Sequence, residues 1–215
     1  MRILSEHRKT SHPAGDFVWK VKKTPIPDVR SVTVIGKYCP GIFSKIVGVL
    51  TLNGFDILTA RSYRQNRQNT LDLFNVRKLP GMASRTGGFV KAENDLRSVL
   101  SGRLDLSLAL YKRATVRQKE RLREASKSSH HIVVDNRTSD RFSVIRVSAS
   151  DFAGLLFRVT DAIFRCNFYV WTAKIETKGG RVFDEFYVRD VHEQKILSPN
   201  QMTTLKTAIQ RALSK

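Results

Sequence analysis

The stretch KYCPGIFSKIVGVL (residues 37–50) places a Pro-Gly pair between an apolar strand pattern and an apolar helix pattern. The residues before it, SVTVI (residues 31–35), are rich in β-branched side chains, which favour an extended strand. Pro40 fixes φ for the turn, so Gly41 lies at the helix N-terminus, where unpaired N–H groups carry partial positive charge. Such a helix end can bind a carboxylate. The apolar residues that follow at helical spacing are Ile42, Phe43, Ile46, Val47 and Leu50.

The same turn and helix occur a second time along the chain. ASDFAGLLFRVTDAIFRCNFYVWTAKI (residues 149–175) aligns without a gap with GKYCPGIFSKIVGVLTLNGFDILTARS (residues 36–62). Further on, LDLFNVR (residues 71–77) matches FDEFYVR (residues 183–189) if the intervening hairpin is one residue shorter in the second copy. An internal repeat of this kind indicates a duplicated structural unit. The matched pairs are Gly41 and Gly154, Ile42 and Leu155, Phe43 and Leu156, Ile46 and Val159, Leu50 and Ile163, Phe55 and Phe168, and Ala60 and Ala173.

Each copy predicts the order strand, helix, strand, strand, helix, because the apolar period switches from alternation to 3.6 and back. Antiparallel strands with helices on one face form an α+β fold. A short run, HIVVD (residues 131–135), predicts an extra strand, and Phe17, Val18 and Trp19 are apolar enough to pack as another strand or against a neighbouring domain. The expected strands are 31–37, 55–64, 70–78, 141–149, 168–178 and 181–190, and the expected helices are 41–53, 92–109, 154–166 and 199–213.

The Gly turn, the helix that follows it and the Phe-x-Val third strand together resemble an ACT domain, present twice. VVDNRTSDRFSVIRV (residues 133–147) narrows this to a resemblance to the C-terminal region of bacterial PII uridylyltransferase/uridylyl-removing enzymes. Two departures from the ACT turn are Tyr38, where Asp is usual, and Ala153, where Pro is usual. The resemblance implies two ferredoxin-like βαββα units paired side by side. The domains expected are an N-terminal tether (1–30), a first ACT domain (31–110), a basic helical linker (111–130) and a second ACT domain (131–215).

Side-by-side pairing, as the resemblance implies it, would create two related clefts at the Gly turns. Backbone N–H groups after Gly41 or Gly154 could bind the carboxylate of a free amino acid, and Asp or Asn side chains could take its ammonium or amide group. The resemblance implies glutamine, although nothing in the residues themselves selects it. Asp151 opens the second turn only, which predicts two unequal sites. The candidate ligand-binding residues are Gly41, Ile42, Phe43, Asn53, Asp56, Asp151, Gly154, Leu155, Leu156 and Asn167.

Catalytic motifs of the resembled enzymes are missing from the sequence. Nucleotidyl transfer needs a Gly-Ser turn followed by Asp-x-Asp, and the hydrolase needs a His-Asp pair among further histidines; neither pattern occurs. We therefore expect this chain to be catalytically silent, with no metal and no cofactor. The expected partners are a free amino acid, the catalytic domains of a uridylyltransferase and, through them, PII protein, while self-association stays open. Without a secretory signal or a membrane span, a cytoplasmic location is expected.

The net charge of +19 and the pI near 10.4 are typical of proteins that bind nucleic acid or an anionic surface. Part of this charge lies in the predicted linker, and no aromatic platform of the RNA-binding kind interleaves it. Two alternatives to a sensor thus stay open. One is a stand-alone basic tandem-ACT protein that binds nucleic acid, and the other is a structural docking module without a ligand, which would use Trp19 or Trp171. The two cysteines, Cys39 and Cys166, occupy different places in the repeat and predict no disulfide framework.

Overall fold

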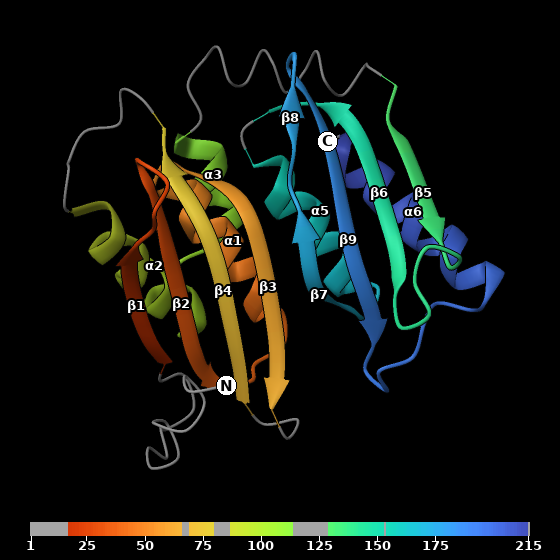
Figure 1. Cartoon of the computed structure of the whole chain (residues 1–215), viewed down its shortest axis with the longest axis horizontal. Coiled ribbons are helices and arrows are strands. Elements are labelled where there is room, and N and C mark those ends of the chain that lie inside the picture. The colour runs from red at the N-terminus through yellow and green to blue at the C-terminus, as the bar shows by residue number, and fades with distance from the viewer. Residues whose placement is uncertain (1–16, 66–68, 80–86, 114–128, 153, 215) are drawn as a thin grey trace.

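The computed structural model describes residues 17–65, 69–79, 87–113, 129–152 and 154–214. These residues form one sheet with the strand order β1-β2-β4-β3-β7-β9-β6-β5, with β8 paired to β9, and every pairing is antiparallel. The helices lie on one face of the sheet (Figure 1). The α+β class expected from the sequence is confirmed.

The described strands are β1 (Phe17–Lys23), β2 (Val29–Lys37), β3 (Phe55–Gln65), β4 (Asn69–Lys78), β5 (His131–Asp135), β6 (Ser143–Ser150), β7 (Phe168–Lys174), β8 (Thr177–Lys178) and β9 (Arg181–Asp190). The described helices are α1 (Ile42–Leu52), α2 (Gly87–Leu100), α3 (Leu106–Arg113), α5 (Leu155–Arg165) and α6 (Pro199–Leu213). The apolar stretches at the starts of the two copies are both ordered, as β1 and β5. Each half of the sheet therefore has the same order: β1-β2-β4-β3 in the first and β5-β6-β9-β7 in the second.

The two halves meet where β3 pairs with β7. Ala60 lies opposite Ala173, its own match in the repeat, and Thr59 and Arg61 pair with Lys174 and Thr172. A pairing in which a residue faces its own counterpart is what a twofold relation between the units produces. Each of these strands also bulges at the matched place, between Ile57 and Thr59 in β3 and between Val170 and Thr172 in β7. Behind this junction α1 packs against α5. The repeat in the sequence is thus a repeat in the backbone.

The core lies between the sheet and the helices, as the alternating apolar pattern of the strands requires. The third strand of each unit contributes the same two side chains, Phe74 and Val76 in β4 and Phe186 and Val188 in β9, and all four are fully buried. The side chain of Trp19 packs partly buried against the core, with its ring centroid 6.4 Å from that of Phe17. Trp19 is therefore used within the first unit.

The single helix expected over residues 92–109 is wrong: the structure has α2 and α3 with a turn between them. Gly102 ends α2 with a left-handed φ of 72°, and the N–H of Arg103 donates to the carbonyl of Ser98 at 2.8 Å. This is the Schellman arrangement, which glycine favours. Asp105 then caps α3 by accepting a hydrogen bond from the N–H of Leu108 at 2.9 Å.

The strand expected over residues 168–178 is also interrupted. β7 ends at Lys174, and β8 resumes the pairing with β9 at Thr177. Between them, the N–H of Glu176 donates to Oδ1 of Asp184 at 3.3 Å instead of to a neighbouring strand. A buried carboxyl group in β9 thus replaces a strand partner at this point, beside the second Gly turn.

Candidate ligand site

Both Gly turns have the local geometry that the sequence predicts for a helix start. Gly41 and Gly154 are the N-cap residues of α1 and α5, with left-handed φ values of 72° and 90°. A residue with a Cβ is strained in this conformation, which explains the glycine at both places. Neither helix has an acidic residue in its first turn, so the partial positive charge at each helix start is not offset by a carboxylate of that turn.

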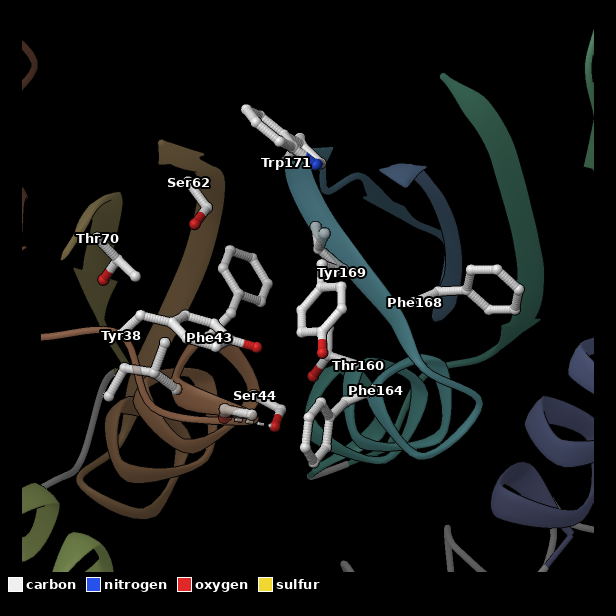
Figure 2. A pocket seen from close by; sticks show the side chains of 13 residues that line it. Tyr38, Phe43, Ser44, Ser62, Thr70, Thr160, Phe164, Phe168, Tyr169 and Trp171 are labelled. Atoms are coloured by element: carbon white, nitrogen blue, oxygen red, sulfur yellow. Dashed lines mark hydrogen bonds between the residues drawn. The ribbon is translucent and has the colours of Figure 1, made fainter. Parts of the chain in front are cut away.

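The first turn is filled by aromatic rings. A Cβ added to Gly41 would lie 2.9 Å from Cε1 of Phe164, a residue of the other unit. The ring of Tyr169 lies between those of Tyr38 and Phe164, with centroid distances of 5.9 Å and 6.3 Å (Figure 2). The cavity left between the units at this turn has a volume of about 30 Å³. That is room for about one water molecule, far less than the hundreds of Å³ of a typical ligand pocket.

The second turn is open where the first is filled. Within the described part of the chain, and leaving aside the residues next to Gly154 and the backbone of its own helix, no heavy atom lies within 4 Å of a Cβ built on Gly154. The repeat also matches each ring of the first turn with a small or polar residue. Tyr38 corresponds to Asp151, Tyr169 to Asp56, and Phe164 to Thr51. The twofold relation therefore predicts two carboxylates and a hydroxyl group around the second turn, in place of three aromatic rings.

A buried carboxyl group lies beside each turn. In the first unit, Asp72 is fully buried, and its Oδ2 accepts a hydrogen bond from Oγ1 of Thr70 at 2.8 Å. In the second unit, Asp184 occupies the matched position and is only 1% exposed. The pKa of Asp184 is raised to about 7, chiefly because burial disfavours the charged carboxylate; the Glu176 hydrogen bond lowers this pKa in part, and the charge of Asp151 raises it.

The structure divides the predicted site residues between the two turns. Gly41, Ile42 and Phe43 line the small aromatic cavity of the first turn, and Asn167 lies at the adjacent start of β7. Asp151, Gly154, Leu155 and Leu156 form the second turn and the start of α5. The N–H of Leu155 already donates to the carbonyl of Phe152 at 3.1 Å. In α5, the N–H groups of Leu156 and Phe157 are then the ones that helix geometry leaves for a ligand.

Three predicted polar residues have structural roles in this conformation. The buried amide of Asn53 donates to the carbonyl of Val49 at 2.9 Å and to Oδ2 of Asp95 at 2.8 Å, which ties α1 to α2. Asp56 forms an ion pair with Arg77 at 2.9 Å, and both side chains are partly exposed. Asn167 is exposed with φ of 64° and takes the turn conformation that Gly54 takes in the first unit. Of these residues, Asp56 is the one whose carboxylate can exchange an exposed partner for a ligand.

Sequence reasoning missed Asp184, Phe164 and Tyr169. The signal for Asp184 was present, because an Asp in the apolar alternation of FDEFYVR falls on the buried face of a strand. The aromatic filling of the first turn could be found only by placing residues 164 and 169 of one unit against residue 38 of the other.

A larger cavity of about 320 Å³ lies on the other side of Tyr38, within the first unit. Its walls are mostly apolar but include Lys37 and Lys45, and Lys45 Nζ donates to the carbonyl of Pro40 at 3.2 Å. Burial raises the pKa of the Cys39 thiol in this wall. The cavity is a competing place for a small anionic ligand, and the experiment below includes it. Its lining residues are Phe17, Val34, Gly36, Lys37, Tyr38, Cys39, Ile42, Lys45, Thr70 and Leu100.

On the helix-free face of the second unit, arginine side chains form ion pairs with carboxylates or stack on aromatic rings of the same unit. Arg146 pairs with Asp135 at 2.8 Å and with Glu185 at 2.9 Å. The guanidinium of Arg189 stacks on Phe142 and Trp171, at 4.5 Å and 5.4 Å from the ring centroids. These aromatic rings are therefore occupied by an arginine of the same unit. Of the predicted linker, residues 114–128 lie outside the described residues.

The fold and the two turns define a protein of duplicated α+β units joined through one sheet. Known proteins similar to the chain are bifunctional uridylyltransferase/uridylyl-removing enzymes. That of Rhodospirillum rubrum is 33% identical over 97% of this chain and 22% of its own length. Those of Gluconobacter oxydans and Ruegeria pomeroyi are 34% and 31% identical, over 90% and 81% of this chain. These relatives confirm the resemblance to uridylyltransferase/uridylyl-removing enzymes, and the chain spans about a fifth of their length.

No protein-family model matches the chain. Among solved structures, a double-ringed trimeric shell protein from the RMM microcompartment covers 86% of this chain at 13% identity, and its TM-score of 0.26 carries no argument. No helix in the described ranges has both the length and the apolar character needed to span a membrane.

Proposed function

We propose that this chain is the amino-acid-sensing regulatory region of a uridylyltransferase/uridylyl-removing protein, built from two ACT units. Glutamine is the first candidate ligand, and the second turn is the binding site. The observation that carries the proposal is the inequality of the two turns. One is filled by Tyr38, Phe164 and Tyr169, whereas the matched residues of the other are Asp151, Thr51 and Asp56.

The second turn offers complementary groups for both charges of a free amino acid. The start of α5 provides N–H groups and a positive field for the carboxylate. Asp151 and Asp56 provide carboxylates for an ammonium group, and in the twofold arrangement they come from different units. A ligand held by both units would stabilise one packing of α1 against α5 and of β3 against β7. It would shift the population toward that packing.

In a protein as long as these relatives, such a shift in population would be the signal that this region passes to the other domains. The partners proposed for this region are the catalytic domains of a uridylyltransferase and, through them, PII protein. Coupling of this kind is reciprocal: if the ligand favours one state of the catalytic domains, that state must also bind the ligand more tightly. The aromatic first turn would serve as the fixed half of the pair, because its rings already bridge the two units.

Replacing Asp151 with Tyr, the residue at the matched place of the first turn, should weaken glutamine binding. The phenol ring would occupy the second turn and remove a carboxylate, so we expect at least a tenfold rise in Kd, from the loss of one charged hydrogen bond. Isothermal titration calorimetry of the purified chain with millimolar L-glutamine measures this, and circular dichroism checks the fold.

Lys45→Ala is the matched control, because Lys45 lies in α1, lines the larger cavity of the first unit and is not part of the second turn. It should bind glutamine as the unmodified chain does. Binding that Lys45→Ala abolishes and Asp151→Tyr leaves intact would move the ligand to the first unit. An unmodified chain that gives no heat and no rise in melting temperature with glutamine or other free amino acids would refute the sensor.

A further inference from the structure

Asp184 differs from its counterpart in the first unit in the donor that it uses: Asp184 accepts a backbone N–H at 3.3 Å, whereas Asp72 accepts a hydroxyl at 2.8 Å. Asp72 accepts a hydrogen bond from Thr70 and lies opposite Ser62 on the neighbouring strand. The residues that match these two hydroxyls beside Asp184 are Val182 and Ile175. The second unit therefore has the same acid as the first, but aliphatic side chains take the places of both hydroxyl groups.

The two oxygens of Asp184 differ in their partners. Oδ1 accepts the N–H of Glu176 at a long 3.3 Å, while Oδ2 has no hydrogen-bond partner among the described residues. A buried carboxyl oxygen without a donor is costly, and such a group in a native structure calls for an explanation. Its apolar surroundings include Val147, which faces it from β6, and Val182. Among the described residues of these strands, the structure shows no second donor to Asp184.

The position of Asp184 connects it to the second turn. β9 begins directly beside that turn, since the N–H of Asp151 donates to the carbonyl of Gly180 at 2.8 Å. Asp151 is also the charged side chain whose field acts on Asp184. Two carboxyl groups thus influence each other near the start of α5: Asp151, exposed on the turn, and Asp184, buried in the strand four residues after Gly180. A cation bound here would be attracted by both carboxyl groups, and an ammonium group would also supply N–H donors.

We propose that Asp184, together with Asp151, is the subsite that takes the ammonium group of a free amino acid bound at the second turn. This assignment rests on the proposed function and adds to it the residue that binds the amino group. A primary ammonium group has three donors, enough for Oδ2 of Asp184 and for Asp151. The carboxylate of the same ligand then faces the start of α5, where the N–H groups of Leu156 and Phe157 lie.

Proton release accompanies binding in this assignment. Burial gives Asp184 a pKa near 7, so about half of the molecules carry a proton on this group at pH 7. An ammonium group favours the ionised carboxylate, and its arrival would expel that proton. Calorimetry at pH 7 in buffers of different ionisation enthalpy should therefore detect the release of up to roughly half a proton per ligand. Asp184→Asn should remove this release.

The test compares L-glutamine with 4-carbamoylbutanoate, which is glutamine without its amino group, on the full chain. We expect the unmodified chain to prefer glutamine by about 10- to 100-fold, as for a hydrogen bond to a charged group. Asp184→Asn should lose most of this preference, because Asp151 alone then remains for the ammonium group, and Asp72→Asn, the matched change in the first unit, should keep it. A preference that is undiminished in Asp184→Asn overturns the assignment but leaves the sensor standing.

Two further outcomes also decide the question. If the unmodified chain binds neither compound, the proposed function fails and the ammonium subsite fails with it. If magnesium or calcium chloride, without any amino acid, raises the melting temperature of the unmodified chain but not of Asp184→Asn, the two carboxyls bind a metal ion, and the ammonium assignment is overturned.

Discussion

Replacing Asp184 with Asn is expected to raise the free energy of unfolding at pH 8 by up to about 4 kcal/mol. Asp184 has a folded-state pKa of about 7, compared with 3.8 for an unperturbed Asp, because burial disfavours its charged form. A group that holds its proton more tightly in the folded state lowers stability as pH rises. The free energy of unfolding should thus fall between about pH 4 and pH 7 and change little above that range. Asparagine keeps the acceptor for the Glu176 N–H without the charge.

Urea denaturation at pH 4, 6 and 8 measures this effect, with Asp140→Asn as an exposed control in the same unit. We expect Asp184→Asn and the unmodified chain to differ little at pH 4 and most at pH 8. Equal stabilities at pH 8, or a variant that is less stable there, would show that Asp184 is not a destabilising buried acid. The combination of higher stability and weaker glutamine binding in one variant would identify a residue retained for binding.

Phe186→Ala should lower the free energy of unfolding by about 3 to 5 kcal/mol, because it deletes a fully buried ring from the centre of β9. We also expect both units to unfold in a single transition, since β3 and β7 join them in one sheet and α1 packs on α5. Phe183→Ala is the control: it lies on the same strand but is 46% exposed. Differential scanning calorimetry that resolves a second, unshifted transition in Phe186→Ala would show that the units fold separately.

Much of the fold was predictable because the signals were local and occurred twice. The β-branched run before residue 37, the helical spacing after Gly41 and the copy at Gly154 placed strands and helices within a few residues of their observed bounds. The error over residues 92–109 was avoidable in physical terms. A glycine followed three residues later by an aspartate, as at Gly102 and Asp105, provides a helix end and a new helix cap.

The candidate site was less predictable, because its character depends on contacts between the units. The sequence indicated both Gly turns and the asymmetry due to Asp151. It could not show that Phe164 covers Gly41, since these residues lie far apart in the chain and meet only when β3 pairs with β7. Likewise, the amide of Asn53 belongs to the α1–α2 packing, a tertiary role that its place after a helix does not reveal.

The central claim is that a free amino acid binds at the second turn, and amide chemical shifts of the ¹⁵N-labelled chain during a glutamine titration test it most directly. We predict the largest shift changes at Asp151, Gly154, Leu156 and Asp184, with saturation at a single Kd and little change around Cys39 and Lys45. Spectra that do not change with millimolar glutamine, or changes confined to the first turn, would contradict the account.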